Sequence, residues 1–337
     1  MILICGNYGA GNFGDELILK GIINLLLSVG VPKENILVLS GNPKNTEEIH
    51  GVKAEKHLPT GVRSFCKSLI SSSMKRTMQA IKSADFVLFG GGGLFNEDES
   101  YSIYLWGAHA KAFQYWKKKT IVIGQSFPEI RGNRTKKMIK NLIEKAERVI
   151  VREVESRQNL EKIGIQKDIE ILADPAFFAY EESPESLPKS QKIIACLRDY
   201  KKIKQKNIRN LLDPMELNIE YEDFERTTNA DTFEKLFQEF KSAKLIIAMR
   251  LHSMILAVIT GTPFIALNYS EKVKNMAKKL GFAGESIDFP LTKSTFEEHI
   301  KKIFLKAESI QKQLQETFQK EHQDKEKYRN ILTKFIK

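Results

Sequence analysis

A cation and an imidazole follow one of the most apolar segments of this chain. Residues 245–249 predict a buried strand, Arg250 and His252 come next, and a helix of small residues is expected over 253–260. Ligands of open α/β sheets bind just beyond the carboxyl ends of the strands. An arginine and a titratable ring at such a position fit an anionic substrate that requires a proton transfer. The structural alternative is a surface arginine beside a histidine that caps the helix.

The glycine-rich loop over 6–16, GNYGAGNFGDE, lies between a predicted strand and a predicted helix. It contains GAGNFG, which matches the GxGxxG fingerprint of a dinucleotide site. However, three extra residues separate the strand from the motif, and the next predicted strand, ILVLS, lacks the acidic residue that would bind a ribose. We therefore expect no NAD site but a turn that leads into a helix, where Asn12 and Asp15 cap the helix or touch a ligand.

A second glycine-rich loop, GGGGLFNEDES over 90–100, follows a predicted buried strand. Because glycine has no side chain, Gly91, Gly92 and Gly93 would let a ligand approach the backbone and its N–H groups. Close packing between elements is the alternative for these glycines. Glu97, later in the loop, is a candidate to orient a hydroxyl of a second substrate, unless it is simply a solvated carboxylate.

Two further strand ends carry polar side chains. Gln125 lies in the loop IGQSFPE over 123–129, and Arg152 comes directly after the next predicted strand, 148–151. The planar guanidinium of arginine can donate two parallel hydrogen bonds to a carboxylate or a phosphate. Its position at a strand end therefore favours binding of an anion over simple solvation.

Alternating strands and helices must position these groups. Their order predicts an α/β fold with two doubly wound, Rossmann-like domains that face a cleft. The polar stretch EESPESLPKSQ separates an N-terminal domain, residues 1–182, from a second domain, residues 191–300. Residues 301–337 are rich in lysine, with apolar residues at near-helical spacing. This pattern predicts a basic amphipathic C-terminal helix that packs on the body of the protein or, alternatively, on lipid.

Composition limits the classes of function. The 337 residues are 42% hydrophobic, which is enough for two cores, and the formal net charge is +11. Most basic residues are lysines spread over the predicted helices, and no helix-turn-helix, zinc-finger or RNP pattern occurs, so we expect no nucleic-acid partner. No apolar segment reaches the roughly 20 residues of a membrane span, and no signal peptide is recognised, which predicts a cytoplasmic protein.

The cysteines suggest reduced thiols. Cys5, Cys66 and Cys196 are far apart and lack CxxC spacing, and no cluster of Asp, Glu and His has the spacing of metal ligands. We therefore expect no metal site.

Several motifs, in this order along the chain, resemble those of the polysaccharide pyruvyltransferase family. They are GNFGDE (11–16), GGGGLFNED (90–98), GQ (124–125), VREVES (151–156), ADPAF (173–177), MRLHSMILA (249–257) and NYSEKV (268–273). Each motif alone is modest, but their order and spacing over most of the chain make the similarity specific. The loop after Gln125 reads SFPEI where the family usually has GIGP, so the acceptor site or the phosphate site on that side is expected to differ.

The resemblance implies a glycosyltransferase-B-like arrangement and transfer of pyruvate from phosphoenolpyruvate, without a cofactor, onto two sugar hydroxyls as a cyclic ketal. It also implies that Arg152, His252 and Lys272 hold and activate phosphoenolpyruvate. The residues agree with this chemistry, because Arg250 can help to clamp the anion. The charge of the substrate would also raise the pKa of His252, as a proton donor near neutral pH requires.

The acceptor is expected to be a glycan of a cell-surface or extracellular polysaccharide, either in a growing polymer or on a lipid carrier. It would be reached from the cytoplasmic face of the membrane, with weak electrostatic membrane contact. Two other classes stay open: a sugar-nucleotide-dependent glycosyltransferase of the same architecture, and a non-catalytic protein of polysaccharide assembly. A binding protein needs no proton donor beside a pair of cations, which argues against the last class.

Overall fold

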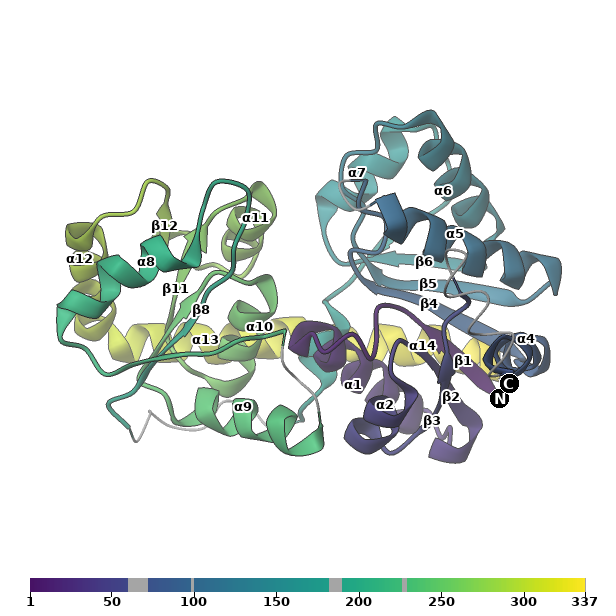
Figure 1. Ribbon diagram of the computed structural model, residues 1–337, viewed down its shortest axis with the longest axis horizontal. Coiled ribbons are helices and arrows are strands. Elements are labelled where there is room, and N and C mark those ends of the chain that lie inside the picture. Colours follow the sequence, from purple (N-terminus) through teal and green to yellow (C-terminus); the bar gives the residue numbers. More distant parts are fainter. Residues whose placement is uncertain (60–71, 98–99, 182–189, 226–228, 337) are drawn as a thin grey trace. The chain divides into compact units, whose positions relative to one another are not determined.

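The chain forms two compact units in the computed structural model (Figure 1). Unit 1 comprises Met1–Ala179 and Asp324–Lys337, and unit 2 comprises Tyr180–Gln323. The structure describes residues 1–59, 72–97, 100–181, 190–225 and 229–336. The predicted domain boundary between 182 and 191 therefore lies largely outside the described residues, and Cys66 lies outside them as well.

Seven parallel strands form the sheet of unit 1 among the described residues, in the order β3-β2-β1-β4-β5-β6-β7. They are β1 (Ile2–Cys5), β2 (Ile36–Ser40), β3 (Lys53–Lys56), β4 (Phe86–Gly92), β5 (Lys119–Gln125), β6 (Arg148–Val151) and β7 (Glu170–Ile171). The helices between them are α1 (Phe13–Ser28), α2 (Pro43–His50), α4 (Ser73–Ser83), α5 (Ser100–Tyr115), α6 (Asn133–Lys145) and α7 (Val154–Lys162). Because helices cover both faces, β1 and β2 are apolar and buried at almost every position, without alternation.

The core of unit 1 lies on both faces of its sheet. On one face, α4, α5 and α6 pack against alternate residues of the central strands. On the other face, α1 packs with α14 (Asp324–Ile336) and with the 3-10 turn η2 (Pro175–Phe178) (Figure 1). Gly21 of α1 permits the close approach, because a Cβ there would lie 1.8 Å from the carbonyl oxygen of Pro175.

Five parallel strands form the sheet of unit 2 in the described part of the chain, in the order β12-β11-β10-β8-β9. They are β8 (Ile193–Cys196), β9 (Ile219–Tyr221), β10 (Leu245–Ala248), β11 (Phe264–Asn268) and β12 (Ser286–Asp288). The helices are α8 (Gln205–Leu212), α9 (Ala230–Ser242), α10 (Leu251–Thr260), α11 (Glu271–Lys279), α12 (Lys293–Leu305) and α13 (Ala307–His322). β10 lies at the centre of this sheet, so the groups that follow it emerge between neighbouring strand ends.

The C-terminal region contains the end of α12 and the two further helices α13 and α14. The apolar residues Ile310, Leu314 and Phe318 of α13 are buried, whereas Leu305 at the end of α12 is 77% exposed. α14 belongs to unit 1, where the Tyr328 hydroxyl donates to the Ala173 carbonyl at 3.0 Å. These contacts favour the predicted packing on the body of the protein over packing on lipid.

The predicted α/β class, with two doubly wound parallel sheets and a helical C-terminal region, is confirmed, but the single helix expected over 301–337 is divided into the end of α12, α13 and α14. Of the helices described, none is both long enough and apolar enough to cross a membrane.

Candidate active site

Arg250, His252 and Lys272 lie at the carboxyl ends of two neighbouring strands in unit 2. β10 and β11 pair in parallel, and α10 and α11 begin directly beyond them. Arg250 is the extended N-cap residue of α10, and its carbonyl accepts hydrogen bonds from the Ser253 N–H (3.1 Å) and hydroxyl (2.6 Å). His252 lies in the first turn of α10 and is partly exposed, and Lys272 lies in the first turn of α11 and is exposed. The structure thus brings these three predicted residues to one edge of one sheet.

The Arg250 guanidinium is largely buried and only partly satisfied. Its side chain is 9% exposed, and Nη2 donates to Oε1 of Glu225 at 2.9 Å. Its Nε is buried and has no hydrogen-bond partner among the described residues. A buried donor without an acceptor is costly, so this arginine is suited to receive a further anionic group.

Arg198 is a residue at the same edge that the sequence reasoning missed. It follows β8, the strand that pairs with β10 on the side opposite to β11, and its N–H donates to the Met249 sulfur at 3.4 Å. Its guanidinium lies 6.0 Å from the centre of the Tyr269 ring, and its Nε is buried without a partner in the described part of the chain. The available signal was an arginine directly after the apolar segment 193–197, the same pattern that singled out Arg250.

Helix ends add to the positive potential at this edge. Neither Arg250 at the start of α10 nor Ser270 at the start of α11 makes a side-chain capping hydrogen bond within the described residues. The first N–H groups of a helix carry the positive end of its dipole and attract anions. Two helix N-termini and three cationic side chains therefore favour an anionic ligand here.

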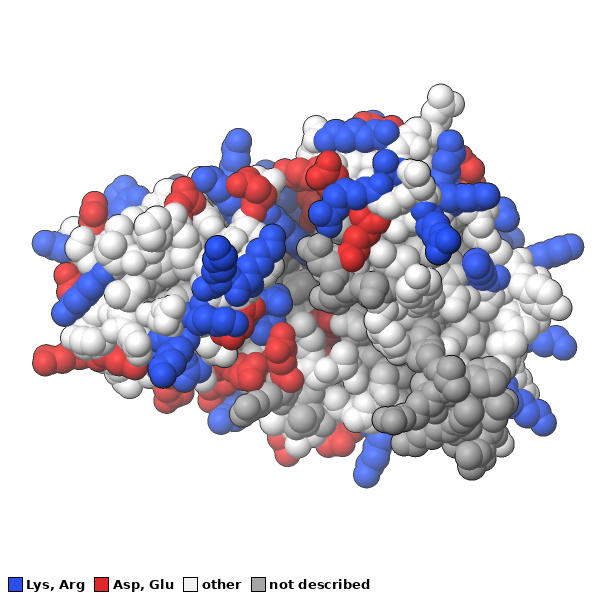
Figure 2. All heavy atoms as spheres, turned by 45° about the horizontal axis from the view of Figure 1, so that its top comes forward, with Lys and Arg blue, Asp and Glu red and all other residues white. Residues whose placement is uncertain are grey.

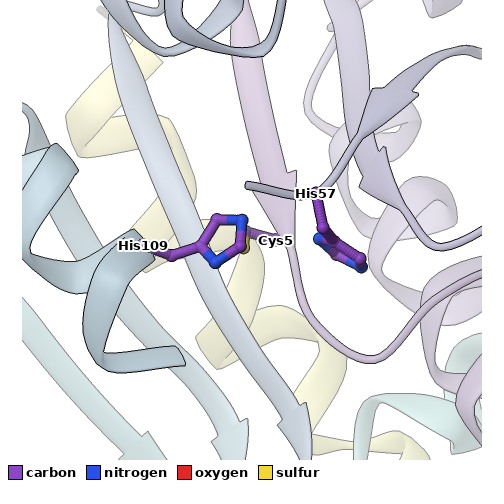
Figure 3. A group of neighbouring side chains, drawn as sticks. All are labelled: Cys5, His57 and His109. Atoms are coloured by element: carbon purple, nitrogen blue, oxygen red, sulfur yellow. The ribbon is translucent and has the colours of Figure 1, made fainter. Parts of the chain in front are cut away.

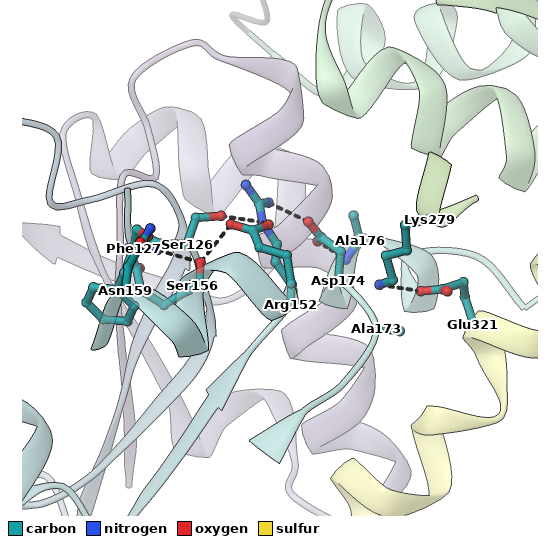
Figure 4. Close-up of polar contacts among 12 residues, drawn as sticks. Ser126, Phe127, Arg152, Ser156, Asn159, Ala173, Asp174, Ala176, Lys279 and Glu321 are labelled. Atoms are coloured by element: carbon teal, nitrogen blue, oxygen red, sulfur yellow. Dashed lines mark hydrogen bonds and ion pairs between the residues drawn. The ribbon is translucent and has the colours of Figure 1, made fainter. Parts of the chain in front are cut away.

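Arg152 lies in unit 1 at the centre of a buried polar network (Figure 4). Its Nη1 donates to the carboxylate of Asp174, and its Nε donates to the Ser126 hydroxyl (2.7 Å) and to Glu153 (3.3 Å). Burial by itself lowers the pKa of Arg152, but the charges of Asp174 and Glu153 outweigh it and raise that pKa. Arg152, which was predicted to bind phosphoenolpyruvate, is thus held by two carboxylates. Its side chain connects the end of β6 to the loop after β5 and to the start of η2.

The Arg152 network extends through Ser156 and Asp174. The Ser156 hydroxyl accepts from the Phe127 N–H (2.7 Å) and donates to Glu153 (2.8 Å), while Asp174 accepts from the Ala176 N–H at 3.0 Å. Asp174 belongs to the ADPAF motif, to which sequence reasoning gave no role. The network fixes the loop after Gln125, which is itself buried, with its Nε2 donating to the Ser126 carbonyl.

Gly91 and Gly92 lie inside β4 with left-handed φ values of 84° and 87°. A Cβ on Gly91 would lie 2.6 Å from the Tyr8 hydroxyl oxygen and 2.7 Å from Ile18. Close packing therefore accounts for Gly91, and the Tyr8 hydroxyl donates to the Gly90 carbonyl beside it at 2.9 Å. Gly93, by contrast, is exposed beyond the strand end and keeps its predicted availability to a ligand.

Asn12 and Asp15 organise the first glycine-rich loop. Asn12 is the N-cap residue of α1 and accepts from the Gly14 N–H at 2.9 Å, as the capping alternative predicted. Asp15 accepts from the Asn7 side-chain amide at 2.8 Å. These bonds hold the loop against the helix and do not test the predicted ligand contact.

Glu97 holds the segment that precedes α6. Its carboxylate accepts from the N–H groups of Arg131 (2.7 Å) and Gly132 (2.9 Å). Slight burial raises the pKa of Glu97, but these hydrogen bonds and one from Thr135 outweigh it, so the pKa lies below its usual value. The structure thus gives Glu97 a loop-fixing role beside the predicted contact with an acceptor hydroxyl.

The comparisons with known proteins agree with the motifs. The family model described as polysaccharide pyruvyl transferase matches residues 12–271. The chain belongs to this family. It is therefore a transferase of this kind, and the predicted resemblance is confirmed. None of the curated proteins matches the chain.

Solved structures with the same fold cover nearly the whole chain. HepE from Anabaena, in complex with UDP-glucose, has a TM-score of 0.60 at 12% identity and covers 99% of this chain and 98% of its own. UDP-GlcNAc 2-epimerase from Neisseria meningitidis, bound to UDP-GlcNAc, has a TM-score of 0.59 at 11% identity, with 100% and 99% covered. The lipopolysaccharide outer core galactosyltransferase WaaB has a TM-score of 0.51 at 12% identity, with 96% and 98% covered. These likenesses establish a glycosyltransferase-B-like fold.

The geometry around GAGNFG leads us to expect that the transferase does not bind NADH specifically. α1 begins at Phe13, so the last glycine of the motif lies inside the helix, and β2 ends at Ser40 and is followed by Gly41. No carboxylate thus follows β2 directly to bind a ribose. A fluorescence titration with micromolar NADH should show no saturable quenching, and saturable quenching would contradict this expectation.

Potential metal ligands gather in the core of unit 1. Ligand atoms of Cys5, His57 and His109 lie within 4.8 Å of one another (Figure 3). However, one ring nitrogen of His109 bonds to the Leu105 carbonyl (2.9 Å) and the other accepts from the Leu58 N–H (3.1 Å). Burial lowers the pKa of His109 to about 4 and raises the pKa of the Cys5 thiol. This is the chemistry of a neutral core cluster, and the expectation of no metal stays a prediction.

Three carboxylates form a second cluster, in unit 2. Glu220, Glu222 and Glu239 are partly exposed, and burial together with the charge of Glu239 raises the pKa of Glu222. Glu220 is paired with Lys192 at 2.7 Å. The Lys192 ammonium therefore already reduces the repulsion within this group.

Proposed function

We propose that this transferase takes pyruvate from phosphoenolpyruvate and attaches it to two hydroxyls of one sugar residue as a cyclic ketal. The observation that carries the proposal is the gathering of Arg250, His252 and Lys272 at neighbouring strand ends, in a chain of this family. Phosphoenolpyruvate carries a phosphate and a carboxylate, which suit cationic side chains and helix N-termini.

The reaction needs one proton at the methylene carbon of phosphoenolpyruvate. Protonation turns the methylene into a methyl group and leaves an oxocarbenium-like carbon that still carries the phosphate oxygen. One sugar hydroxyl attacks this carbon and loses its proton, and a second hydroxyl of the same sugar then displaces phosphate and loses its own proton. Two carbon–oxygen bonds form and one breaks, so the transfer is redox-neutral and needs no cofactor.

The residues take different parts in this proposal. His252 delivers the proton, because a partly exposed imidazole at a helix N-terminus can exchange protons with solvent between turnovers. Arg250 and Lys272 hold the anionic donor and stabilise the charge that develops on the departing phosphate. Arg152 is a positioning residue, because its guanidinium already bonds to Asp174, Ser126 and Glu153.

The phosphate release assay tests the reaction. Phosphoenolpyruvate is incubated with the protein and a panel of glycan acceptors, and released phosphate and the ketal product are measured. Phosphate release that depends on both donor and acceptor supports the proposal. A melting temperature that rises with a uridine diphosphate sugar but not with phosphoenolpyruvate would instead favour the glycosyltransferase alternative.

We further propose that the acceptor is a lipid-linked glycan or growing polymer at the cytoplasmic face of the membrane. The net charge is +11, and lysine and arginine side chains are distributed over the face in Figure 2 with acidic groups between them. Because the apolar residues of α13 are buried, membrane attraction would be electrostatic, about 1 kcal/mol for each well-placed lysine.

Weak binding to anionic liposomes at low salt is therefore expected, with release at high salt. Co-sedimentation with anionic and with neutral liposomes at both salt concentrations measures this binding. Equal absence of binding under all conditions would favour a soluble sugar or nucleotide sugar as the acceptor.

A further inference from the structure

Two arginines stand two residues beyond the last registered pair of neighbouring strands in unit 2. β8 and β10 pair in parallel up to Cys196 and Ala248, and Arg198 and Arg250 follow at equivalent positions. The bond from the Arg198 N–H to the Met249 sulfur shows that the two chain segments stay adjacent there. The Nε atoms of both arginines are buried and lack hydrogen-bond partners among the described residues.

Nearby carboxylates compensate this charge only in part. Glu225, the carboxylate bonded to Arg250, has a side chain that is 57% exposed. Asp199, next to Arg198 in sequence, is bonded instead to the Lys204 ammonium (3.1 Å) and the Gln205 N–H (3.0 Å). Each of the two guanidinium groups keeps a buried Nε donor without an acceptor among the described residues, and an oxyanion at this strand edge would supply one.

The number of donors distinguishes between possible anions. One carboxylate has two oxygens, and a single guanidinium can satisfy both of them. A phosphate monoester presents three oxygens and a double negative charge, which suit two guanidinium groups and the N-terminus of α10. Arg198 is also steadied from one side by the ring of Tyr269, which in turn contacts Tyr200 (centroids 4.7 Å apart). The arrangement thus fits a phosphate better than a carboxylate.

We propose that Arg198 and Arg250 form a clamp for the phosphate group of a phosphate monoester, and that Glu225 occupies Arg250 until this ligand displaces it. The identification of this phosphate monoester as phosphoenolpyruvate rests on the proposed function. In this proposal Arg198 belongs to the binding site, and His252 still delivers the proton.

Isothermal titration with three probes tests the clamp: inorganic phosphate, phosphoenolpyruvate and pyruvate. Arg198→Gln is expected to weaken binding of phosphate and phosphoenolpyruvate about 10- to 100-fold, as for loss of charge-assisted hydrogen bonds. Arg198→Lys should recover only part of that affinity, because the planar fork is lost. Pyruvate, which has no phosphate, should bind weakly and equally to all variants.

Two other variants make the result specific. Arg209→Gln removes the same charge from unit 2, but Arg209 stacks on Tyr221 at 4.1 Å and bonds to Gln205. The affinity of the Arg209→Gln variant for phosphate should therefore stay unchanged. Glu225→Gln should tighten phosphate binding about 2- to 5-fold, because a competing carboxylate is removed. Thermal unfolding of each variant confirms that it is folded.

Equal affinities of the native protein and Arg198→Gln for phosphate would overturn the clamp, and so would an equal loss in Arg209→Gln. The proposed function fails separately. If phosphate binding depends on Arg198 but no acceptor takes up pyruvate, the result supports the clamp and contradicts the proposed ketal transfer. If ketal transfer occurs and Arg198→Lys has an unchanged KM for phosphoenolpyruvate and an unchanged phosphate affinity, the result supports the proposed transfer and contradicts the clamp.

Discussion

Replacing His252 by alanine is expected to lower the rate of pyruvyl transfer about 100-fold or more, with phosphoenolpyruvate affinity nearly unchanged. The reason is that the imidazole supplies a proton in the transition state, whereas Arg250 and Lys272 hold the donor in the ground state. Removal of an interaction that is made only in the transition state lowers kcat and kcat/KM together. Steady-state phosphate release and isothermal titration with phosphoenolpyruvate measure the two quantities.

A matched histidine provides the control for this variant. His299 of α12 is partly buried and bonds to the Thr295 carbonyl within its own helix at 2.8 Å. His299→Ala should leave kcat and KM close to those of the native protein. Lys272→Ala should show the opposite pattern to His252→Ala: the affinity for phosphoenolpyruvate should fall more than the turnover rate. A turnover of His252→Ala close to the native rate would mean that another group delivers the proton.

Local sequence patterns were sufficient to place the candidate residues at one edge of the sheet of unit 2. The apolar residues of β10 and Met249, followed by Arg250 and a largely apolar segment, specify a strand, a turn and a helix start in that order. Parallel register then places Lys272 beside them, because β11 is the next strand in both sequence and space. The order of strands and helices likewise specified the fold class.

Contacts between distant segments could not be predicted in the same way. Arg152 and Asp174 are 22 residues apart, and their pairing depends on how η2 folds back against β6. Arg198 lies 51 residues before Met249, and only the crossover from β8 to β10 makes them neighbours. Gly91 appeared to offer space for a ligand, yet Tyr8 and Ile18 fill that space. In each case the deciding partner comes from a segment that is distant in the sequence.

Replacing Arg152 by alanine is expected to lower the free energy of unfolding of unit 1 by about 3–5 kcal/mol, as for breaking a buried ion pair from one side. The side chains of Arg152 and Asp174 are 1% and 0% exposed, so the remaining carboxylate would be buried without its counter-charge. Urea unfolding followed by circular dichroism measures the loss. Arg157→Ala is the control, because its pair with Glu161 is about half exposed and such pairs contribute about 0–1 kcal/mol.

A second substitution separates the structural role of Arg152 from the predicted donor contact. In Arg152→Met combined with Asp174→Asn, the fully buried carboxylate is removed together with its counter-charge. Glu153, whose side chain is 17% exposed, keeps its hydrogen bond from Ser156, so much of the lost stability should return. Activity that returns with stability would mean that Arg152 acts by holding the loop after Gln125. Activity that stays low in the restabilised protein, with weakened phosphoenolpyruvate binding, would mean that the guanidinium itself contributes to the donor site. Unchanged stability of Arg152→Ala would contradict the structural role, because a buried aspartate cannot lose its counter-charge without cost.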